Sequence, residues 1–373
     1  MVLTDHMPWG HRSIARAIYN YLKSREMESE YVVEFVTVPA KTGIGGDVYN
    51  FVYKYMPASN IVAHRLSHNE MLINLFKEVS IINLPDVKRA VKRFKPDLVI
   101  SAYFLHSHSL AKWREQDGRA HKFELWTVVA DPWTINPISF VPGADKHLVY
   151  DEVGREMAKK YGVNPKTVMA TGWWTRPEMY VKQDQSEARK KLGLSQDMPV
   201  IFVGGGSLGT NALPKILPTL LVVKTKMGII FNSGTDKLGY KMVEEFAKWY
   251  KRIRKDGLVE IVNLGWIDNM AEVLSAADIV FGKAGPNFVF DVIATKKPFV
   301  SITHIGGQED GNIDLIQKKK LGWIKEKNGT LGKFLLEYLE NSQKYNLKYK
   351  ETIAFEAVKN QKTLERIWKE IEK

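Results

Sequence analysis

FGKAGPNFVFDV, at residues 281–292, predicts the end of a buried strand, a glycine turn and the start of a helix. VGGGSLGT, at residues 203–210, repeats the pattern after another apolar run. In both stretches the turn places backbone N–H groups and the positive end of a helix dipole where an anion binds. Asp291 lies one and a half turns into the second helix, at a spacing that can reach the ribose of a nucleotide. The two stretches therefore predict a diphosphate pocket.

Around these stretches, short apolar runs alternate with helical sequence along the chain. The expected strands are 1–4, 31–38, 97–104, 123–131 and 146–151 in the first half, and 199–207, 228–235, 259–267, 277–285 and 297–305 in the second. This alternation predicts an α/β protein with two doubly wound parallel sheets. Because ligands of such sheets bind beyond the carboxyl ends of the strands, we expect the pocket in a cleft between two facing units.

The length of 373 residues suits two domains. A polar stretch at 171–199 separates the two halves. We therefore expect an N-terminal domain over 1–178 and a C-terminal nucleotide-binding domain over 179–350. A helical segment over 351–373 is expected to return to the first domain. The chain has no cysteine, no secretory signal and no apolar run of membrane-spanning length, which together favour a cytoplasmic protein.

The formal charge of +12 favours an anionic partner. The basic excess is spread over both halves and accompanies no nucleic-acid-binding motif, so we exclude nucleic acid. The densest basic cluster, Lys88 to Lys95, has two interpretations: a solvated helix face, which we favour slightly, or an edge that rests on anionic lipid. Segment 45–76 mixes aromatic and basic residues. It is either an interfacial segment that enters lipid headgroups or an ordinary amphipathic helix.

Several motifs together resemble one family. They are GHRSIARAI at 10–18, VVAD at 128–131, TGWWTRPEM at 171–179, VGGGSLGT at 203–210, GWIDNMAEVLSAADIVFGKAGPNFVFDVIA at 265–294 and GGQEDGN at 306–312. In these residues the chain resembles the diacylglycerol glycosyltransferases of the monogalactosyldiacylglycerol synthase type. It is more distantly similar to the peptidoglycan N-acetylglucosaminyltransferase. All have the GT-B fold, with two Rossmann-like domains facing a central cleft.

The resemblance implies that the domain over 179–350 binds a UDP-sugar donor and that the domain over 1–178 binds the acceptor. In the donor site, Gly285 and Pro286 approach the phosphates, Asp291 binds the ribose, and Gln308 and Glu309 face the sugar. The expected donor-binding residues are Gly204, Gly205, Gly206, Ser207, Trp266, Ile267, Lys283, Gly285, Pro286, Asp291, Gln308, Glu309 and Asn312. No metal and no cofactor are expected, because helix ends and Lys283 or Arg176 can stabilise the leaving diphosphate.

The acceptor hydroxyl needs a base in order to attack the anomeric carbon. His11, placed by the resemblance, and Asp131, at the carboxyl end of a strand, are the candidates. An ordinary histidine pKa suits this task, although His11 could also be a helix cap or a packed residue. Trp133, Trp173 and Trp174 either line an acceptor groove or fill the core.

We therefore predict an enzyme that transfers a hexose from a UDP-sugar to a lipid such as diacylglycerol, as a peripheral protein on the inner face of an anionic membrane. Two alternatives stay open. One is an enzyme similar to the UDP-sugar 2-epimerases, against which GGQEDGN and segment 45–76 argue. The other is a degenerate, non-catalytic nucleotide-sugar binder, favoured by the bulky DHMPWGH loop at 5–11, where the family has a run of glycines.

Overall fold

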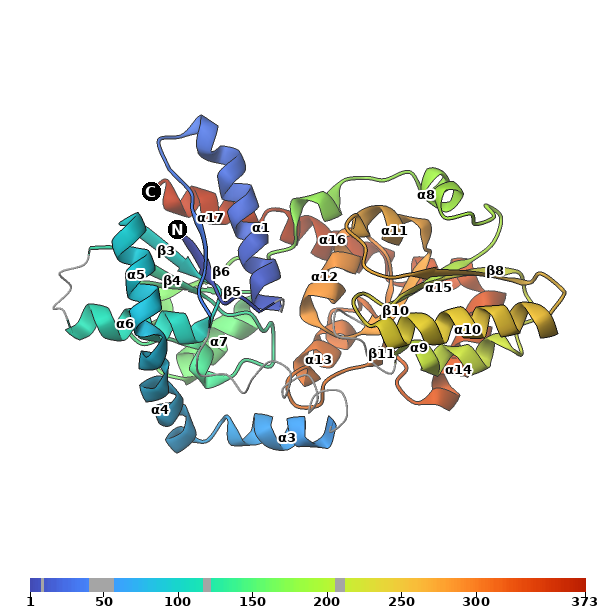
Figure 1. Ribbon diagram of the computed structural model, residues 1–373, viewed down its shortest axis with the longest axis horizontal. Coiled ribbons are helices and arrows are strands. Elements are labelled where there is room, and N and C mark those ends of the chain that lie inside the picture. Colours follow the sequence, from blue (N-terminus) through green and yellow to red (C-terminus); the bar gives the residue numbers. More distant parts are fainter. Residues whose placement is uncertain (8–9, 40–56, 117–121, 205–211) are drawn as a thin grey trace. The chain divides into compact units, whose positions relative to one another are not determined.

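The computed structural model describes residues 1–7, 10–39, 57–116, 122–204 and 212–373 (Figure 1). They divide into two compact units. The N-terminal unit comprises Met1–Pro177, Gly306–Gly311 and Lys359–Lys373, and the C-terminal unit comprises Glu178–Ile305 and Asn312–Val358. Each unit contains one six-stranded sheet in which every strand pair is parallel, which confirms the expected fold class.

The N-terminal sheet has the strand order β2-β1-β3-β4-β5-β6. Its strands are β1 (Val2–Thr4), β2 (Phe35–Thr37), β3 (Leu98–Ser101), β4 (Glu124–Val128), β5 (Lys146–Val149) and β6 (Val168–Ala170). The first five are shorter than the apolar runs that predicted them, because each run extends past one or both ends of its strand. The sequence interpretation missed β6, whose three residues VMA are too few for a recognisable pattern.

Helices cover both faces of this sheet because their apolar residues recur at helical spacing. In α1 the buried positions are Ile14, Ala15, Ala17, Ile18 and Leu22. The helices of this unit are α1 (Gly10–Arg25), α3 (Pro57–Leu66), α4 (Glu70–Val79), α5 (Leu84–Phe94), α6 (Phe104–Gln116), α7 (Glu152–Lys160) and α17 (Thr363–Ile371). No helix in the described part of the chain is long and apolar enough to cross a bilayer.

The C-terminal sheet has the order β12-β11-β10-β7-β8-β9. Its strands are β7 (Val200–Gly204), β8 (Met227–Asn232), β9 (Val259–Leu264), β10 (Ile279–Lys283), β11 (Phe299–Thr303) and β12 (Gly322–Ile324). The strand β12 was not predicted. It runs beside β11 at the sheet edge, and its residue Gly322 must be a glycine, since a Cβ there would lie 2.7 Å from the carbonyl carbon of Phe299.

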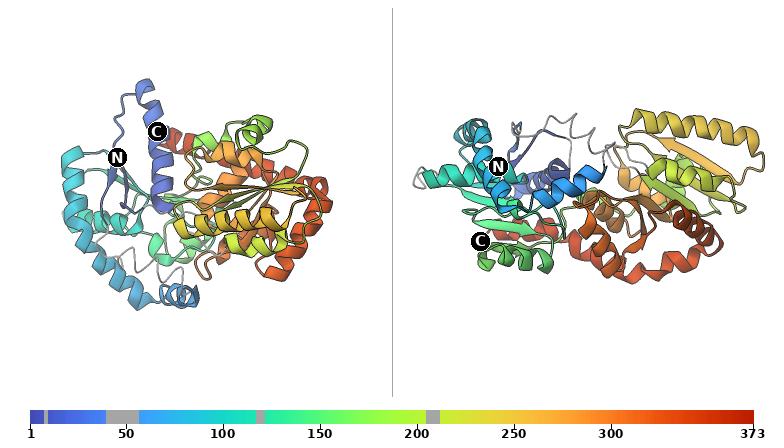
Figure 2. Two further views of the ribbon diagram at one scale, coloured as in Figure 1. Left: turned by 45° about the vertical axis from the view of Figure 1, so that its right-hand side comes forward. Right: turned by 90° about the horizontal axis from the view of Figure 1, so that it is seen from below.

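Three helices, α9 (Ala212–Leu220), α10 (Lys237–Ile253) and α14 (Asn328–Glu340), form a single apolar cluster with the strands of this sheet. Figure 2 shows the long helix α10 in yellow and α14 in orange-red. The remaining helices occupy the connections between strands and the C-terminal end. The helices from residue 185 onward are α8 (Gln185–Lys191), α9 (Ala212–Leu220), α10 (Lys237–Ile253), α11 (Met270–Ala276), α12 (Pro286–Ala294), α13 (Asp310–Lys318), α14 (Asn328–Glu340), α15 (Ser342–Lys348) and α16 (Lys350–Gln361).

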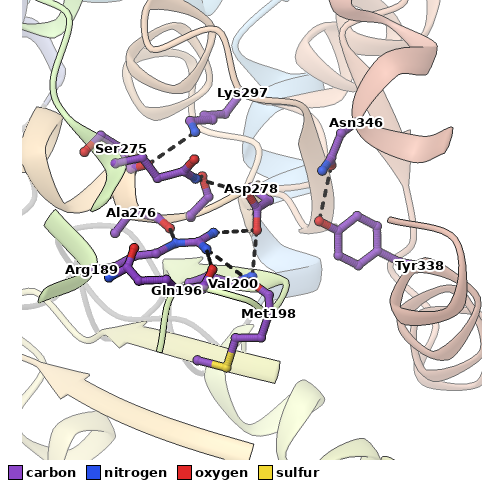
Figure 3. Close-up of polar contacts among 12 residues, drawn as sticks. Arg189, Gln196, Met198, Val200, Ser275, Ala276, Asp278, Lys297, Tyr338 and Asn346 are labelled. Atoms are coloured by element: carbon purple, nitrogen blue, oxygen red, sulfur yellow. Dashed lines mark hydrogen bonds and ion pairs between the residues drawn. The ribbon is translucent and has the colours of Figure 1, made fainter. Parts of the chain in front are cut away.

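An ion pair fastens the start of this sheet (Figure 3). The Nη2 of Arg189 donates to Oδ2 of Asp278 at 2.8 Å, and the same oxygen accepts from the backbone N–H of Val200 at 2.8 Å. The Nε of Arg189 donates to the carbonyl of Ala276 at 3.0 Å. Because Arg189 is buried, this carboxylate compensates its charge and joins α8 to the amino ends of β7 and β10. Asp278, which belongs to the motif at 265–294, therefore has a structural role.

The end of the chain packs on the N-terminal sheet. Segment 351–373 is two helices rather than one, and its part from Lys359 onward belongs to the N-terminal unit. The Oδ1 of Asn360 accepts from the backbone N–H of Trp173 at 2.9 Å, and Thr363 donates to the carbonyl of Thr171 at 3.0 Å. Gly172 lies between them at φ +96°, a conformation that favours glycine.

Candidate functional site

The carboxyl ends of β1, β3 and β4 lie at one edge of the N-terminal sheet. Each strand continues into a polar residue there: His11 in the first turn of α1 after β1, Tyr103 after β3 and Asp131 after β4. The strand β3 lies between the other two, so β1 and β4 are about 10 Å apart at the usual strand spacing. Both expected candidate bases are thus on the binding edge of the sheet.

His11 has its ring edge-on against Tyr103, with a centroid distance of 5.4 Å. Burial lowers the pKa of His11 to about 4, and a hydrogen bond with the Ala102 backbone offsets this only in part. Its Nδ1 is buried without a hydrogen-bond partner. His11 is therefore neutral at physiological pH and a much weaker base than the ordinary pKa would make it.

Two further titratable groups lie at this edge, and the sequence interpretation missed both. Asp5 is fully buried, and burial raises its pKa to about 6 against the favourable charge of Arg12 and the Met7 backbone. His106 is also fully buried, with its ring 5.0 Å from that of Tyr103, and burial lowers its pKa to about 3. Asp5 could have been found as the first acid after a strand. His106, inside a helix, carries no such signal.

Asp131 has a different environment. Burial, together with the negative charge of Glu309, raises the pKa of Asp131 to about 7. Glu309 comes from Gly306–Gly311, a segment that belongs to the N-terminal unit although it follows β11 in the chain. A carboxylate with a pKa near the working pH is well suited to general-base catalysis. The pKa of Asp131 therefore suits a general base better than the pKa of His11 does.

Two glycines of the GGQEDGN motif, Gly307 and Gly311, allow this loop to pack closely against other segments of the N-terminal unit. Gly307 has φ +85°, and a Cβ there would lie 2.8 Å from the Cβ of His64. The backbone N–H of Gly311 donates to Oγ1 of Thr134 at 2.5 Å, and a Cβ on Gly311 would lie 2.5 Å from the backbone nitrogen of Thr134. Glycine allows this close backbone approach, which holds Glu309 in place and leaves the side chain of Gln308 exposed.

A separate candidate feature is the turn between β10 and α12 in the C-terminal unit. The backbone N–H of Ala284 donates to the carbonyl of Thr303 at 2.9 Å, and the carbonyl of Ala284 accepts from Nδ2 of Asn312 at 2.8 Å. Both peptide groups of Ala284 are thus fixed. Asn312, expected to contact the donor, is buried and uses its amide group to position the turn beside Lys283.

The helix after this turn, α12, begins directly at the glycine, and the backbone N–H of Gly285 donates to the carbonyl of Lys283 at 2.8 Å. Gly285 is its N-cap and Pro286 its first residue. Proline at this position costs little, because the first N–H of a helix has no partner within the helix. Asp291 lies about 7.5 Å further along the axis, at 1.5 Å per residue. Phe288 packs where side chains of Gly204 and Gly282 would stand, which explains those two glycines.

The other expected residues are dispersed. The indole of Trp266 is exposed in the loop after β9 and donates to Oδ1 of Asp268 at 2.9 Å, and Ile267 is half-buried beside it. Trp173 and Trp174 are buried in the N-terminal unit and fill its core, whereas Trp133 is half-buried. Arg176 is half-buried after β6. Gly205, Gly206, Ser207 and residues 45–56 lie outside the described residues.

An apolar surface covers α3, α4 and the short helix Ser80–Asn83. Its exposed large side chains are Ile61, Val62, Leu66, Met71, Leu75 and Ile82. On the next helix, α5, the basic cluster is partly paired, with Lys88 over the ring of Trp113 and Arg89 3.5 Å from Asp86. Exposed apolar side chains beside basic ones are typical of an interfacial surface.

Comparison with known proteins finds a matching family model for each half of the chain. Residues 11–173 match the monogalactosyldiacylglycerol (MGDG) synthase family, and residues 200–367 match the glycosyltransferase family 28 C-terminal domain. The chain is 23% identical over 337 residues to the chloroplastic MGDG synthase of Spinacia oleracea, covering 86% of this chain and 62% of that protein. It is 25% identical over 308 residues to the UDP-N-acetylglucosamine–N-acetylmuramyl-(pentapeptide) pyrophosphoryl-undecaprenol N-acetylglucosamine transferase of Acetivibrio thermocellus, covering 79% and 74%.

Solved structures agree on the fold. MurG from Acinetobacter baumannii superposes with a TM-score of 0.57 at 15% identity, covering all of this chain and 98% of that one. A putative UDP-N-acetylglucosamine 2-epimerase from Listeria monocytogenes gives 0.59 at 12% identity, covering 100% and 95%. At such identities the likeness concerns the fold alone.

Proposed function

Because this chain joins an MGDG synthase domain to a glycosyltransferase family 28 C-terminal domain, we propose that it transfers a hexose from a UDP-sugar to a lipid acceptor at a membrane surface. The observation that carries the proposal is the fixed turn at Ala284, which presents the N-terminus of α12 beside Lys283. A helix N-terminus with an adjacent cation is suited to bind a diphosphate.

The donor site that we propose lies in the C-terminal unit. The diphosphate binds at Gly285 and the first turn of α12, and Lys283 neutralises part of its charge. Asp291 accepts hydrogen bonds from the ribose, and the exposed ring of Trp266 stacks near the uracil. We further propose that these protein groups stabilise the leaving diphosphate without a metal, in which case transfer persists in EDTA.

In the proposed reaction, an acceptor hydroxyl attacks the anomeric carbon of the sugar. The new C–O bond forms as the bond between that carbon and the diphosphate oxygen breaks, and UDP leaves. Asp131 takes the proton of the hydroxyl, for which its pKa of about 7 is suited. His11 is neutral and positions the acceptor through a hydrogen bond.

The apolar surface of α3 and α4 supports a lipid as the acceptor. Met71 is 80% exposed and Leu75 55% exposed. Two large apolar side chains on one helix that are each more than half exposed are stabilised by entering the headgroup region of a bilayer. The names of the MGDG synthase relatives point to the same acceptor class. This chain spans 62% of the spinach protein and 65% of its Arabidopsis thaliana counterpart.

An assay of UDP release tests the proposal. UDP release that requires diacylglycerol vesicles supports transfer. Interconversion of the free UDP-sugar without lipid would instead indicate an epimerase, and UDP-sugar binding without turnover would indicate a binder. Either result overturns the transferase assignment.

Vesicle sedimentation tests the lipid surface separately. We expect the full chain to sediment with vesicles that contain anionic lipid, and a Met71→Gln/Leu75→Gln variant to lose most of this binding. The matched control is Leu238→Gln/Leu347→Gln, which removes two equally exposed apolar side chains from the C-terminal unit and leaves binding unchanged. Equal binding by both variants would contradict the assignment of the surface.

A further inference from the structure

A polar cluster that the reaction above does not use lies at the carboxyl edge of the C-terminal sheet. His304 directly follows β11, and its Nδ1 is 2.8 Å from both Oε1 and Oε2 of Glu326, which follows β12. The hydroxyl of Ser301 donates to Oε1 of Glu326 at 3.0 Å. The carboxylate therefore fixes the orientation of the imidazole ring.

The backbone beneath Glu326 is fixed as well. Lys215, from α9, donates to the carbonyl of Glu326 at 3.1 Å and to the carbonyl of Ile302 at 2.7 Å. Burial lowers the pKa of Lys215, and Glu326 partly opposes this. The side chains of His304 and Glu326 are each about a quarter exposed, so the cluster is both rigid and accessible to a ligand.

The position of the cluster relates it to the donor turn. Lys283, at the end of β10, pairs in register with Thr303, whose carbonyl accepts from the N–H of Ala284. His304 is the next residue. It therefore leaves the sheet one strand away from the glycine turn, at a strand spacing of about 4.8 Å.

The chemistry of this pair suits an anion. A carboxylate at Nδ1 stabilises the protonated imidazolium, in which Nε2 is also a donor. Glu326, in contact with Nδ1, favours the charged form of the ring, and a nearby anion adds further negative charge. A diphosphate at the glycine turn supplies that negative charge.

From this geometry we propose that His304 binds the diphosphate of the donor through Nε2, and that Glu326 is the positioning residue that orients its ring. The inference rests on the donor site proposed above. It adds a second cationic group at that site, supplied by β11 and independent of Lys283.

The test measures binding of UDP and of uridine to the full chain by calorimetry. His304→Gln is expected to weaken UDP binding by about 10–100-fold, the usual value of a charged hydrogen bond, and to leave uridine binding unchanged. Glu326→Gln should weaken UDP binding less. The double variant should be no weaker than His304→Gln, because Glu326 acts through the histidine. His304→Lys, which restores a cation, should recover part of the affinity. Glu340→Gln, an exposed acid of the same unit, is the control.

The results of the binding experiments distinguish a failure of the proposed function from a failure of the inference about His304. If the wild-type chain binds no UDP, the proposed function fails and the inference fails with it. If the wild type binds UDP and His304→Gln binds it within about twofold, the inference alone is wrong. Equal loss of UDP and uridine would assign His304 to folding rather than to the diphosphate, and so would a failure of His304→Lys to recover any affinity.

Discussion

Replacement of Asp131 by asparagine should slow catalysis strongly and at the same time stabilise the protein at alkaline pH. The pKa of Asp131 is raised from 3.8 to about 7, because the site is desolvated and Glu309 is close. At 1.36 kcal/mol for each pKa unit, the shift corresponds to at most about 4 kcal/mol. Asp131 keeps part of its surface exposed, so we expect about half, ~2 kcal/mol.

The sign follows from linkage. When the pKa of a carboxyl group is higher in the folded state than in the unfolded state, the group contributes its full stabilisation at pH values below its unfolded-state pKa. This stabilisation is lost as the pH rises through its folded-state pKa. Asp131 therefore lowers stability progressively between about pH 4 and pH 7. Asparagine cannot ionise, so the gain of Asp131→Asn over wild type should be full near pH 8 and about half as large near pH 5.5.

Urea unfolding at both pH values measures the gain, and transfer to lipid measures the loss, which should be 10²–10⁴-fold as an order of magnitude. The wild-type rate should fall as the pH drops through about 7. Glu115→Gln, which alters an exposed acid of the same unit, should change neither quantity. A variant with unchanged stability near pH 8 would refute the raised pKa, and a rate loss below about tenfold would remove Asp131 as the base.

Three other changes follow from contacts described above. Asp278→Ala leaves the buried guanidinium of Arg189 uncompensated and should cost about 3–5 kcal/mol in urea unfolding; a loss below 1 kcal/mol would show that the ion pair is dispensable. Gly172 has a positive φ and a Cβ there would contact α17, whereas Gly162 has a positive φ but open space around a Cβ. Gly172→Ala should therefore lower stability more than Gly162→Ala. Equal losses of stability would contradict the packing of α17 against Gly172. His11→Ala should abolish transfer and spare UDP binding, and unchanged transfer in that assay would exclude a role for this histidine.

The fold was predictable because strands of a parallel sheet are buried on both faces and form apolar runs. IFV at 201–203 lies at the centre of β7, and IVF at 279–281 forms the beginning of β10. The three-residue strands β6 and β12 were not predicted, because they pair with longer strands and have no extended apolar run of their own. Tertiary pairing, not local sequence, creates them.

The candidate site was predictable in its positions but not in its electrostatics. Sheet topology placed His11 and Asp131 at the carboxyl edge, as parallel strands require. Their pKa values depend on burial and on Glu309, which is 178 positions away from Asp131 in the sequence. Likewise the Nδ2 of Asn312 donates to the carbonyl of Ala284, a contact that the sequence does not reveal. Such partners emerge only once the chain is folded.

The N-terminal unit is completed by two segments from the far end of the polypeptide, Gly306–Gly311 and Lys359–Lys373. A fragment that stops at Pro177 would leave the backbone N–H of Trp173 and the carbonyl of Thr171 without their hydrogen-bond partners. The two halves are therefore not interchangeable modules. Hybrid enzymes that exchange one half between relatives should fold only when these two distant segments are exchanged along with it.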